Sequence, residues 1–473
     1  MSAAFVRMET LPPRAAPFAA TGLWGWFARR LFATPADIAM TIIGFAAFVL
    51  VAMPLFRFLV FDAIWTGKDR DACLNAAGAC WPFVAAKLNQ FVYGFYPYEE
   101  LWRPNLVFFV GALLLIPLLI PSAPFKRFNA FLFFGIYPVA GFVLLTGGNL
   151  DPQRFLLGRF VRIPEFIDLS AIARFIGVSG HVELGSRGGF RGTFWIDFIA
   201  SAILLTGAVA IIARLFGTRF VTSLKAMAIV FVSLALIIAP VDADFGLRWV
   251  ETREWGGLLV TLVVAITGIV AALPIGVLLA LGRRSQMRLV RWTSIVFIEF
   301  WRGVPLITVL FFATYMLPLF LPGGASIERL VRALIGVALF SGAYMAEVVR
   351  GGLAAVPKHQ YESAAALGLG YWKTMGLIVL PQALTHVIPG IVNNFIGLFK
   401  DTTLVQIVAI LDLLGQVRSA FSDPNWSSPT TLYTGFAFAG MIYFVFCFAM
   451  SRYSLFLEHR AGSNALRVEG AMR

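Results

Sequence analysis

Charged residues are scarce in this chain, and that scarcity decides its class. Asp, Glu, Lys and Arg make up 13% of the sequence, while 59% is hydrophobic. Soluble domains contain about 25% charged residues, so roughly half of the usual polar coat is missing. The mean hydropathy of +0.82 also indicates that lipid is the solvent. We therefore predict an integral membrane protein.

Motifs that would indicate an enzyme are missing as well. No G-x-x-x-x-G-K-[ST] loop occurs, so ATP hydrolysis by that route is excluded for this chain. The four histidines are scattered and form no metal-ligand cluster. Neither a nucleophile elbow nor a Cys/His pairing is present. The sequence therefore predicts no catalytic residue, no metal site and no cofactor bound by this chain.

Cysteine is also rare. The three cysteines are too few for a disulfide scaffold. Cys73 and Cys80 share one polar loop, whereas Cys447 lies in an apolar run. If that loop lies outside the cytoplasm, we expect a disulfide between Cys73 and Cys80. The alternative is two unpaired small residues.

The net charge of +13 raises the question of nucleic acid as a partner. Most of the basic residues lie in short loops beside apolar runs, which is typical of topology selection in membranes. No basic domain with interleaved aromatic residues is present to bind nucleic acid. We therefore exclude nucleic acid and expect membrane lipids around the chain.

Apolar runs of about 20 residues mark candidate membrane spans. We predict ten spans, with eight as the alternative because Arg214, Arg219 and Lys225 crowd the connection within 194–241. The ten runs are 38–61, 104–121, 128–147, 194–214, 223–241, 257–281, 293–320, 331–350, 377–398 and 432–451.

Lysine and arginine predict the orientation of these spans. Placing the N-terminus in the cytoplasm also places most short basic loops there, as the positive-inside rule requires. An even number of spans then returns the C-terminus to the cytoplasm. We expect the chain to divide near residue 250 into the following parts: a tail 1–37, an extension 38–250 with outer loops 62–103 and 148–193, a core 251–455 and a tail 456–473.

The stretch 361–381 carries a specific signature. Its residues fall at the spacing of the E-A-A-x-x-x-G-x9-I-x-L-P pattern, with Glu362, Ser363, Ala364, Ala365 and Gly368 at its start. Ser363 replaces the usual first alanine, which is a small-for-small change. We predict an amphipathic cytoplasmic helix, 358–375, whose small face lets another backbone approach closely. Packing filler is the alternative for an Ala-rich helix taken alone.

Two polar interruptions occur within the apolar runs. Glu299 and Arg302 lie three residues apart and precede Gly303 and Pro305, which weaken a helix. Such a break indicates a substrate cavity, and an ion pair that anchors the span is the alternative.

Near the end of the eighth run, Tyr344, Glu347 and Arg350 predict an interfacial belt with a salt bridge.

The second interruption lies at the end of the ninth run. Lys400, Asp401 and Thr402 follow Asn394 there, and this set suits a zwitterion. Asp401 would accept hydrogen bonds from an ammonium group, and hydroxyls would bind a carboxylate. The alternative is that Asp401 or Thr402 caps an amphipathic helix at 404–418.

Together, these motifs resemble a known family. From Trp255-Gly-Gly-Leu through Arg302-Gly-Val-Pro, the signature and Lys400-Asp-Thr-Thr-Leu, about 200 residues look like the histidine/glutamine-type permeases of bacterial ABC importers. The extended first half resembles the larger permeases of general L-amino-acid and glutamate/glutamine/aspartate/asparagine systems.

The resemblance implies an all-α fold: a type I ABC-importer transmembrane domain with extra N-terminal spans, about 8–10 helices in total. It implies an inner-membrane location and import of L-amino acids. The partners it implies are a paralogous permease, two ATPase subunits that bind ATP and Mg, and a periplasmic amino-acid-binding protein. In this family the signature helix docks into the ATPase. The alternative is an ATP-independent secondary transporter or a membrane assembly protein.

Overall fold

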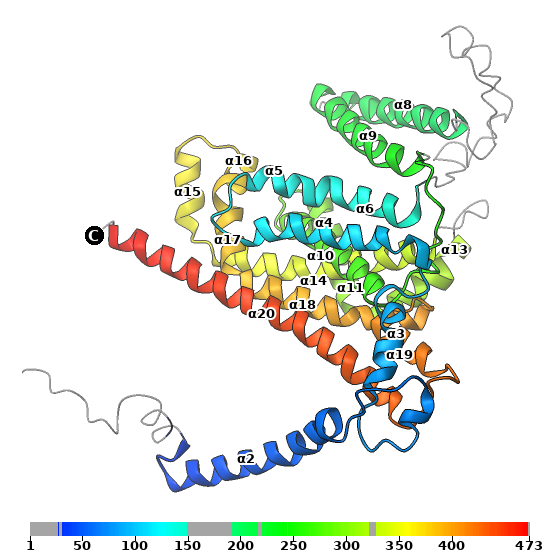
Figure 1. Ribbon diagram of the computed structural model, residues 1–473. Helices are drawn as coiled ribbons and strands as arrows, with labels where there is room; N and C mark the ends of the chain where they lie inside the picture. The colour runs from blue at the N-terminus through cyan, green and yellow to red at the C-terminus, as the bar shows by residue number, and fades with distance from the viewer. Residues whose placement is uncertain are drawn as a thin grey trace, which may run out of the picture. The chain divides into compact units, whose positions relative to one another are not determined.

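The computed structural model describes Phe27 and residues 31–148, 192–215, 220–243, 245–320 and 328–471. The regular elements of these residues are helices (Figure 1). Their β-bridges are isolated pairs. Within these ranges, eight helices are long and apolar enough to cross a membrane, or up to ten if each of two bent helix pairs forms one span. The predicted total of about eight to ten spans is therefore confirmed. Most of loop 148–193 and most of tail 1–37 lie outside the described residues.

The described chain forms two packing units. One contains Met1–Ala86 and Asp423–Gly435, and the other contains Lys87–Ser422 and Phe436–Arg473. The division expected near residue 250 stays a prediction.

The first unit contains helix α2 (Pro35–Phe56). Thr34 and Asp37 form a capping box at its start, and Pro35 follows at the first helical position, where a missing N–H costs nothing. The helix is apolar around its whole circumference, as expected of a helix in lipid, and none of its residues is buried. A π-helical turn, Arg57–Phe61, ends the span.

A disulfide-closed loop is fastened to this π-helical turn. Cys73 and Cys80 form a disulfide, with 5.8 Å between their Cα atoms. The N–H of Ala79 donates to the carbonyl of Phe58 at 2.7 Å, and Nε1 of Trp81 donates to the carbonyl of Leu59 at 2.9 Å. These bonds satisfy carbonyl groups near the end of the span, which have no helical partner beyond it.

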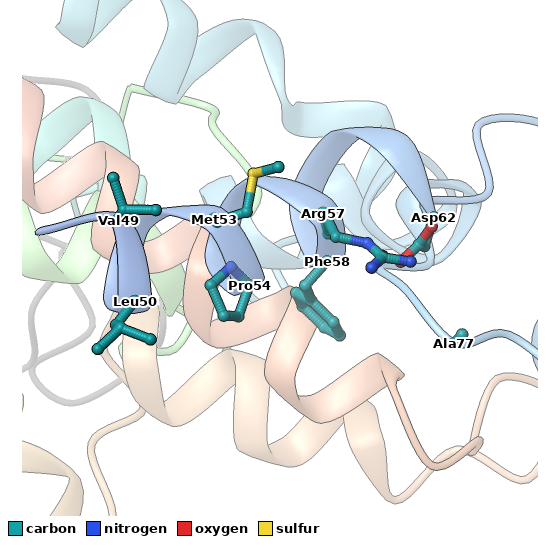
Figure 2. Close-up of a pocket in the computed structure, with 8 residues that line it drawn as sticks. All are labelled: Val49, Leu50, Met53, Pro54, Arg57, Phe58, Asp62 and Ala77. Carbon is teal, nitrogen blue, oxygen red and sulfur yellow. The ribbon is translucent and has the colours of Figure 1, made fainter. Parts of the chain in front are cut away.

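The end of α2 also borders a pocket of about 500 Å³ (Figure 2). Apolar side chains line one part of it, among them Val49, Leu50 and Met53. Arg57 and Asp62 lie at its other end, where Nε and Oδ2 are 3.4 Å apart. The polar groups of this pocket therefore neutralise each other.

The second unit is built around two long helices. Helices α10 (Gly257–Arg283) and α14 (Arg329–Ala355) pack along one another. A Cβ atom at Gly276 would lie 2.6 Å from the Met345 side chain, and one at Gly342 would lie 2.5 Å from Ile275. Small residues at these positions permit the close approach that membrane helices use in place of a hydrophobic driving force.

Helices from the first half of the chain share this core. They are α3 (Trp81–Tyr93), α4 (Trp102–Leu119) and α6 (Tyr137–Thr146), and the short helix α5 (Lys126–Phe131) packs against α4. Tyr96 and Leu145 belong to the same apolar cluster as Leu259 of α10. The Tyr96 hydroxyl donates to the Leu145 carbonyl at 3.0 Å, and burial raises the pKa of Tyr96 to about 12. Two further apolar helices, α8 (Gly192–Leu215) and α9 (Phe220–Asp242), pack together as a pair.

The span expected at 293–320 is interrupted, as its Gly303 and Pro305 predicted. Helix α11 (Arg288–Gly303) is followed by α12 (Leu306–Phe311) and α13 (Leu317–Phe320), with a bend of 103° at the break. Val304 is extended, with φ −103° and ψ 132°, because the ring of Pro305 disfavours a helical residue before it. The weakening expected at Gly303 and Pro305 is therefore confirmed.

A second break divides the ninth predicted span. Helix α17 (Leu380–His386) is followed by α18 (Ile388–Asp401), and the helical segments that contain them, Tyr371–His386 and Ile388–Val408, are bent by 65°. Pro389 lies in the first turn of α18. The proline ring is tolerated in the first turn of a helix. In the interior of one continuous helix it would clash with the carbonyl group four residues earlier.

The helix expected at 404–418 is also not observed. Residues Thr402–Val408 form a 3-10 helix, which ends at Ala409 with a φ of 57°. Helix α19 (Leu413–Phe421) begins only after Asp412, whose side chain accepts hydrogen bonds from the N–H groups of Leu414 and Gly415. Asp401 makes no side-chain cap. The last helix, α20, spans Thr431–Ala471.

Candidate functional site

The signature segment forms a shorter helix than predicted. Helix α15 spans Lys358–Ala366, and a separate turn, α16, spans Tyr371–Thr374. Gly368 ends α15 with a φ of 70°. Its N–H bonds to the carbonyl of Ala365 at 2.9 Å, and the N–H of Leu369 bonds to the carbonyl of Ala364 at 3.1 Å. This is a Schellman motif, and its left-handed residue requires glycine.

One face of the signature helix is buried and the rest is open. Ala364 is 1% exposed, whereas Glu362, Ser363 and Ala365 are exposed. Leu367 beyond them is 77% exposed and Trp372 is 73% exposed. The surface beside this small-residue helix is therefore apolar as well as exposed. The small residues of this surface were predicted from the signature, whereas the two large ones were not. Their sequence signal is the presence of apolar Leu367 and Trp372 within a polar loop.

A small cavity lies between two helices of the core. Its volume is about 260 Å³, and it is lined by Phe340, Ser341 and Tyr344 on α14 and by Asn394, Gly397, Leu398 and Asp401 on α18. The Oδ1 atom of Asn394 is buried and has no hydrogen-bond partner among the described residues. An unsatisfied buried acceptor is costly, so a ligand or water that donates to it is favoured.

Comparison with known proteins identifies the family. Residues 272–462 match the family described as binding-protein-dependent transport system inner membrane component. The chain is 38% identical to the inner membrane amino-acid ABC transporter permease protein YhdY of Escherichia coli K12, over 95% of this chain and 96% of that protein. The chain belongs to the amino-acid ABC transporter permeases.

A second full-length relative agrees. The permease is 38% identical to the glutamate/glutamine/aspartate/asparagine transport system permease protein BztC of Rhodobacter capsulatus, over 96% of this chain and 98% of that protein. The crystal structure of an amino acid ABC transporter with histidines matches 43% of the permease and 92% of its own chain, with 27% identity and a TM-score of 0.38.

Family membership confirms several predictions. The permease is an all-α, multi-span transmembrane domain of a bacterial ABC importer. The alternative of an ATP-independent transporter or assembly protein is not supported. The predicted resemblance to the larger amino-acid permeases is also confirmed, because the two relatives align along nearly the whole chain, including its first half.

The structure brings together only some of the predicted substrate residues. Asn394 and Asp401 line the cavity. Thr402 does not, because its hydroxyl is buried and donates to the Phe399 carbonyl at 2.8 Å. Lys400 is exposed. The roles of Thr402 and Lys400 in substrate binding stay predictions.

Glu299 and Arg302 do not line the cavity. Their closest charged atoms are 3.8 Å apart, so the expected intrahelical pair is present. The Arg302 guanidinium lies 5.8 Å from the centre of the Tyr344 ring, which lines the cavity. A cation over an aromatic face is attracted by the ring quadrupole. The predicted salt bridge between Glu347 and Arg350 is confirmed at 2.8 Å.

A buried polar cluster close to the end of α18 was not predicted. Asp412 is fully buried and accepts a hydrogen bond from the Tyr443 hydroxyl at 2.9 Å. Burial raises the pKa of the Asp412 carboxyl above its usual value. The sequence signal was Asp412 directly before Leu-Leu-Gly-Gln, an N-cap pattern that the expected helix at 404–418 obscured.

Proposed function

We propose that this permease carries L-amino acids across the bacterial inner membrane. The observation that carries the proposal is the cavity, which joins a carboxylate, Asp401, to an unpaired amide, Asn394. Its volume of about 260 Å³ is below the roughly 300–1,000 Å³ of drug-sized sites, so it suits a small solute. The relatives named for amino-acid transport support the same class of substrate.

The cavity offers complementary groups for a zwitterion. Asp401 accepts hydrogen bonds from the ammonium group, and a charge-assisted bond of this kind is about twice as strong as a neutral one. Asn394 and Ser341 supply neutral donors and acceptors for the carboxylate or side chain. Arg302 adds positive charge behind Tyr344 and favours the carboxylate end.

The signature segment supports a partner on the cytoplasmic side. We propose that the open face of α15, with Glu362, Ser363 and Ala365, docks into an ATPase subunit together with Leu367 and Trp372. The complete importer then contains this chain, a paralogous permease, two ATPase subunits that bind ATP and Mg, and a periplasmic binding protein. This chain itself is non-catalytic, and both of its termini lie in the cytoplasm.

Transport then proceeds by alternating access. Closure of the ATPases moves α15, and α14, which leads directly into it, moves with it. The cavity lies between α14 and α18, so this motion changes the side to which it opens. A conformational change needs differential binding free energy between the two states, and ATP and the loaded binding protein supply it.

Substitution of Asp401 tests the proposal. The variant D401N keeps the shape of the side chain but loses the charge, so the complex should assemble while binding-protein-dependent uptake falls about tenfold to a hundredfold. Uptake of labelled amino acids is measured in proteoliposomes that contain the whole complex, with and without vanadate. The exposed loop variant D69N is the matched control and should transport normally.

Two results would contradict this assignment. Normal uptake by D401N removes Asp401 from the site. Uptake by the unmodified complex that vanadate leaves unchanged rules out ATP as the energy source and overturns the proposed function as a whole.

A further inference from the structure

Arg283 joins carboxylates on two neighbouring helices. It is the last residue of α10. Its Nη1 atom lies 2.9 Å from Oε1 of Glu299 on α11 and 2.8 Å from Oε1 of Glu347 on α14. The side chains of Arg283 and Glu347 are 26% and 18% exposed, so solvent screens their pair less than it screens a surface pair.

Each of the two carboxylates has a second arginine on its own helix. Oε2 of Glu299 lies 3.8 Å from Arg302, and Oε2 of Glu347 lies 2.8 Å from Arg350. The result is a row of five alternating charges, Arg302–Glu299–Arg283–Glu347–Arg350, which joins three helices. Arg283 is its middle member, and without it each carboxylate would keep one arginine, but no ion pair would join α11 to α14.

One end of this charge row reaches the cavity. Arg302 lies against the Tyr344 ring, which forms part of the cavity wall. Arg302 also directly precedes the break between α11 and α12, where Val304 is extended. A change in the position of Glu299 is therefore passed to a side chain of the wall and to the break in the helix.

Arg284, the residue after Arg283, contacts the signature helix α15. Nη1 of Arg284 donates to the Leu353 carbonyl in the last turn of α14 and to the Tyr361 hydroxyl on α15, both at 3.1 Å. Arg283 and Arg284 are adjacent along the backbone. A displacement of α15 is therefore transmitted through Arg284 to the end of α10, and through Arg283 to the charge row.

We infer that Arg283 is a positioning residue that couples the motion of α15 to the cavity wall. It touches no substrate and acts through Glu299 and Glu347. The inference rests on the proposed function, because it assigns a path between the proposed ATPase-docking helix and the proposed substrate cavity. A coupling of this kind changes how strongly loaded binding protein stimulates ATP hydrolysis, rather than hydrolysis itself.

The variant R283Q in the complete reconstituted complex tests the inference. We expect normal basal ATP hydrolysis, but stimulation by loaded binding protein reduced about tenfold and more ATP consumed for each amino acid imported. R283K restores a cation that can contact both carboxylates and should recover most of the stimulation. R291Q, which removes an exposed arginine at the start of α11, is the matched control and should behave as the unmodified chain.

A double variant tests whether Arg283 transmits motion through Glu347 or only stabilises the packing of the helices. If Arg283 acts through Glu347, then E347Q shows the same loss and R283Q/E347Q is no worse than either single variant. The inference is overturned if R283Q matches R291Q, or if basal and stimulated hydrolysis fall together in proportion to the yield of complex. If R283Q does not assemble, E347Q with normal stimulation overturns it equally. Absence of ATP-dependent uptake in the unmodified complex contradicts the proposed function instead.

Discussion

The sequence predicts only some of the residues that line the cavity. Asp401 and Asn394 were expected to bind substrate, and the structure places both on the cavity wall. Ser341 and Tyr344 join them from α14, which is distant in sequence. Spacing within one helix indicates which residues share a face, but it says nothing of which other helix that face meets. The partner residues of a cavity therefore emerged only from packing.

Asp412 shows how a single buried carboxylate stabilises an element. It caps α19 and accepts a hydrogen bond from Tyr443. The variant D412A should lower the free energy of unfolding by about 1–3 kcal/mol, since a cap is lost and a buried hydroxyl loses its acceptor. Thermal unfolding of the purified permease in detergent measures the effect. D412N, which keeps a side-chain acceptor, is the control and should lose less.

The pH dependence of this site has a definite sign. Burial raises the pKa of folded Asp412 above its unfolded value. The folded state therefore binds the proton more tightly, and the contribution of this group is full below the unfolded pKa and is lost as the pH rises through the folded pKa. D412N should remove this part of the pH dependence. An unchanged pH profile in D412N would contradict the assignment.

At the scale of elements, the spans were predicted well and their interruptions less well. Apolar runs of sufficient length identify spans whatever their neighbours, because the bilayer sets the length. Pro305 was recognised as a weak point, but the size of the bend, 103°, depends on how α11 packs against α10 and α14. The helix expected at 404–418 begins instead after Asp412, because Ala409 adopts a left-handed conformation that interrupts it. An alanine gives no sequence signal for that conformation.

The end of the signature helix permits a sharp test. No atom lies within 4 Å of a Cβ added at Gly368, so G368A meets backbone strain alone. An alanine at a φ of 70° costs about 1–2 kcal/mol, which should shift α15 and lower coupled uptake about fivefold to thirtyfold. Transport in proteoliposomes is the measurement. G370A is a matched control, because Gly370 has a φ of −70° and equally open surroundings. Equal effects of the two variants would show that the left-handed turn has no role.

At the scale of the whole molecule, the disulfide-closed loop and the residues just before it contact a segment that is distant in the sequence. The N–H of Cys80 donates to Oγ1 of Thr434 at 2.9 Å, and the N–H of Arg70 donates to the Asn425 carbonyl at 3.1 Å. Both contacts lie within the first packing unit. The loop therefore fastens the end of the first span to the segment that leads into the last.

Removal of the disulfide tests this fastening. C73S/C80S should destabilise the loop by about 2–3 kcal/mol, because the unfolded loop gains conformational freedom. Limited proteolysis should then cut near residues 66–76 in spheroplasts, with the cut sites read by mass spectrometry. C447S, which alters the free cysteine, should remain resistant. Cleavage of the double variant in inverted vesicles alone would place the loop in the cytoplasm and contradict the proposed orientation.

The sequence alone determined the class of protein, the spans, the signature helix and the family. Each of these depends on local composition or on residues at fixed spacing along the chain, and neither depends on how the helices pack. The tertiary structure alone decided which polar residues meet: Asn394 with Tyr344, Asp412 with Tyr443, and Arg283 with Glu299 and Glu347. Side chains on different helices come together only through the packing of those helices, and that packing depends on many contacts at once.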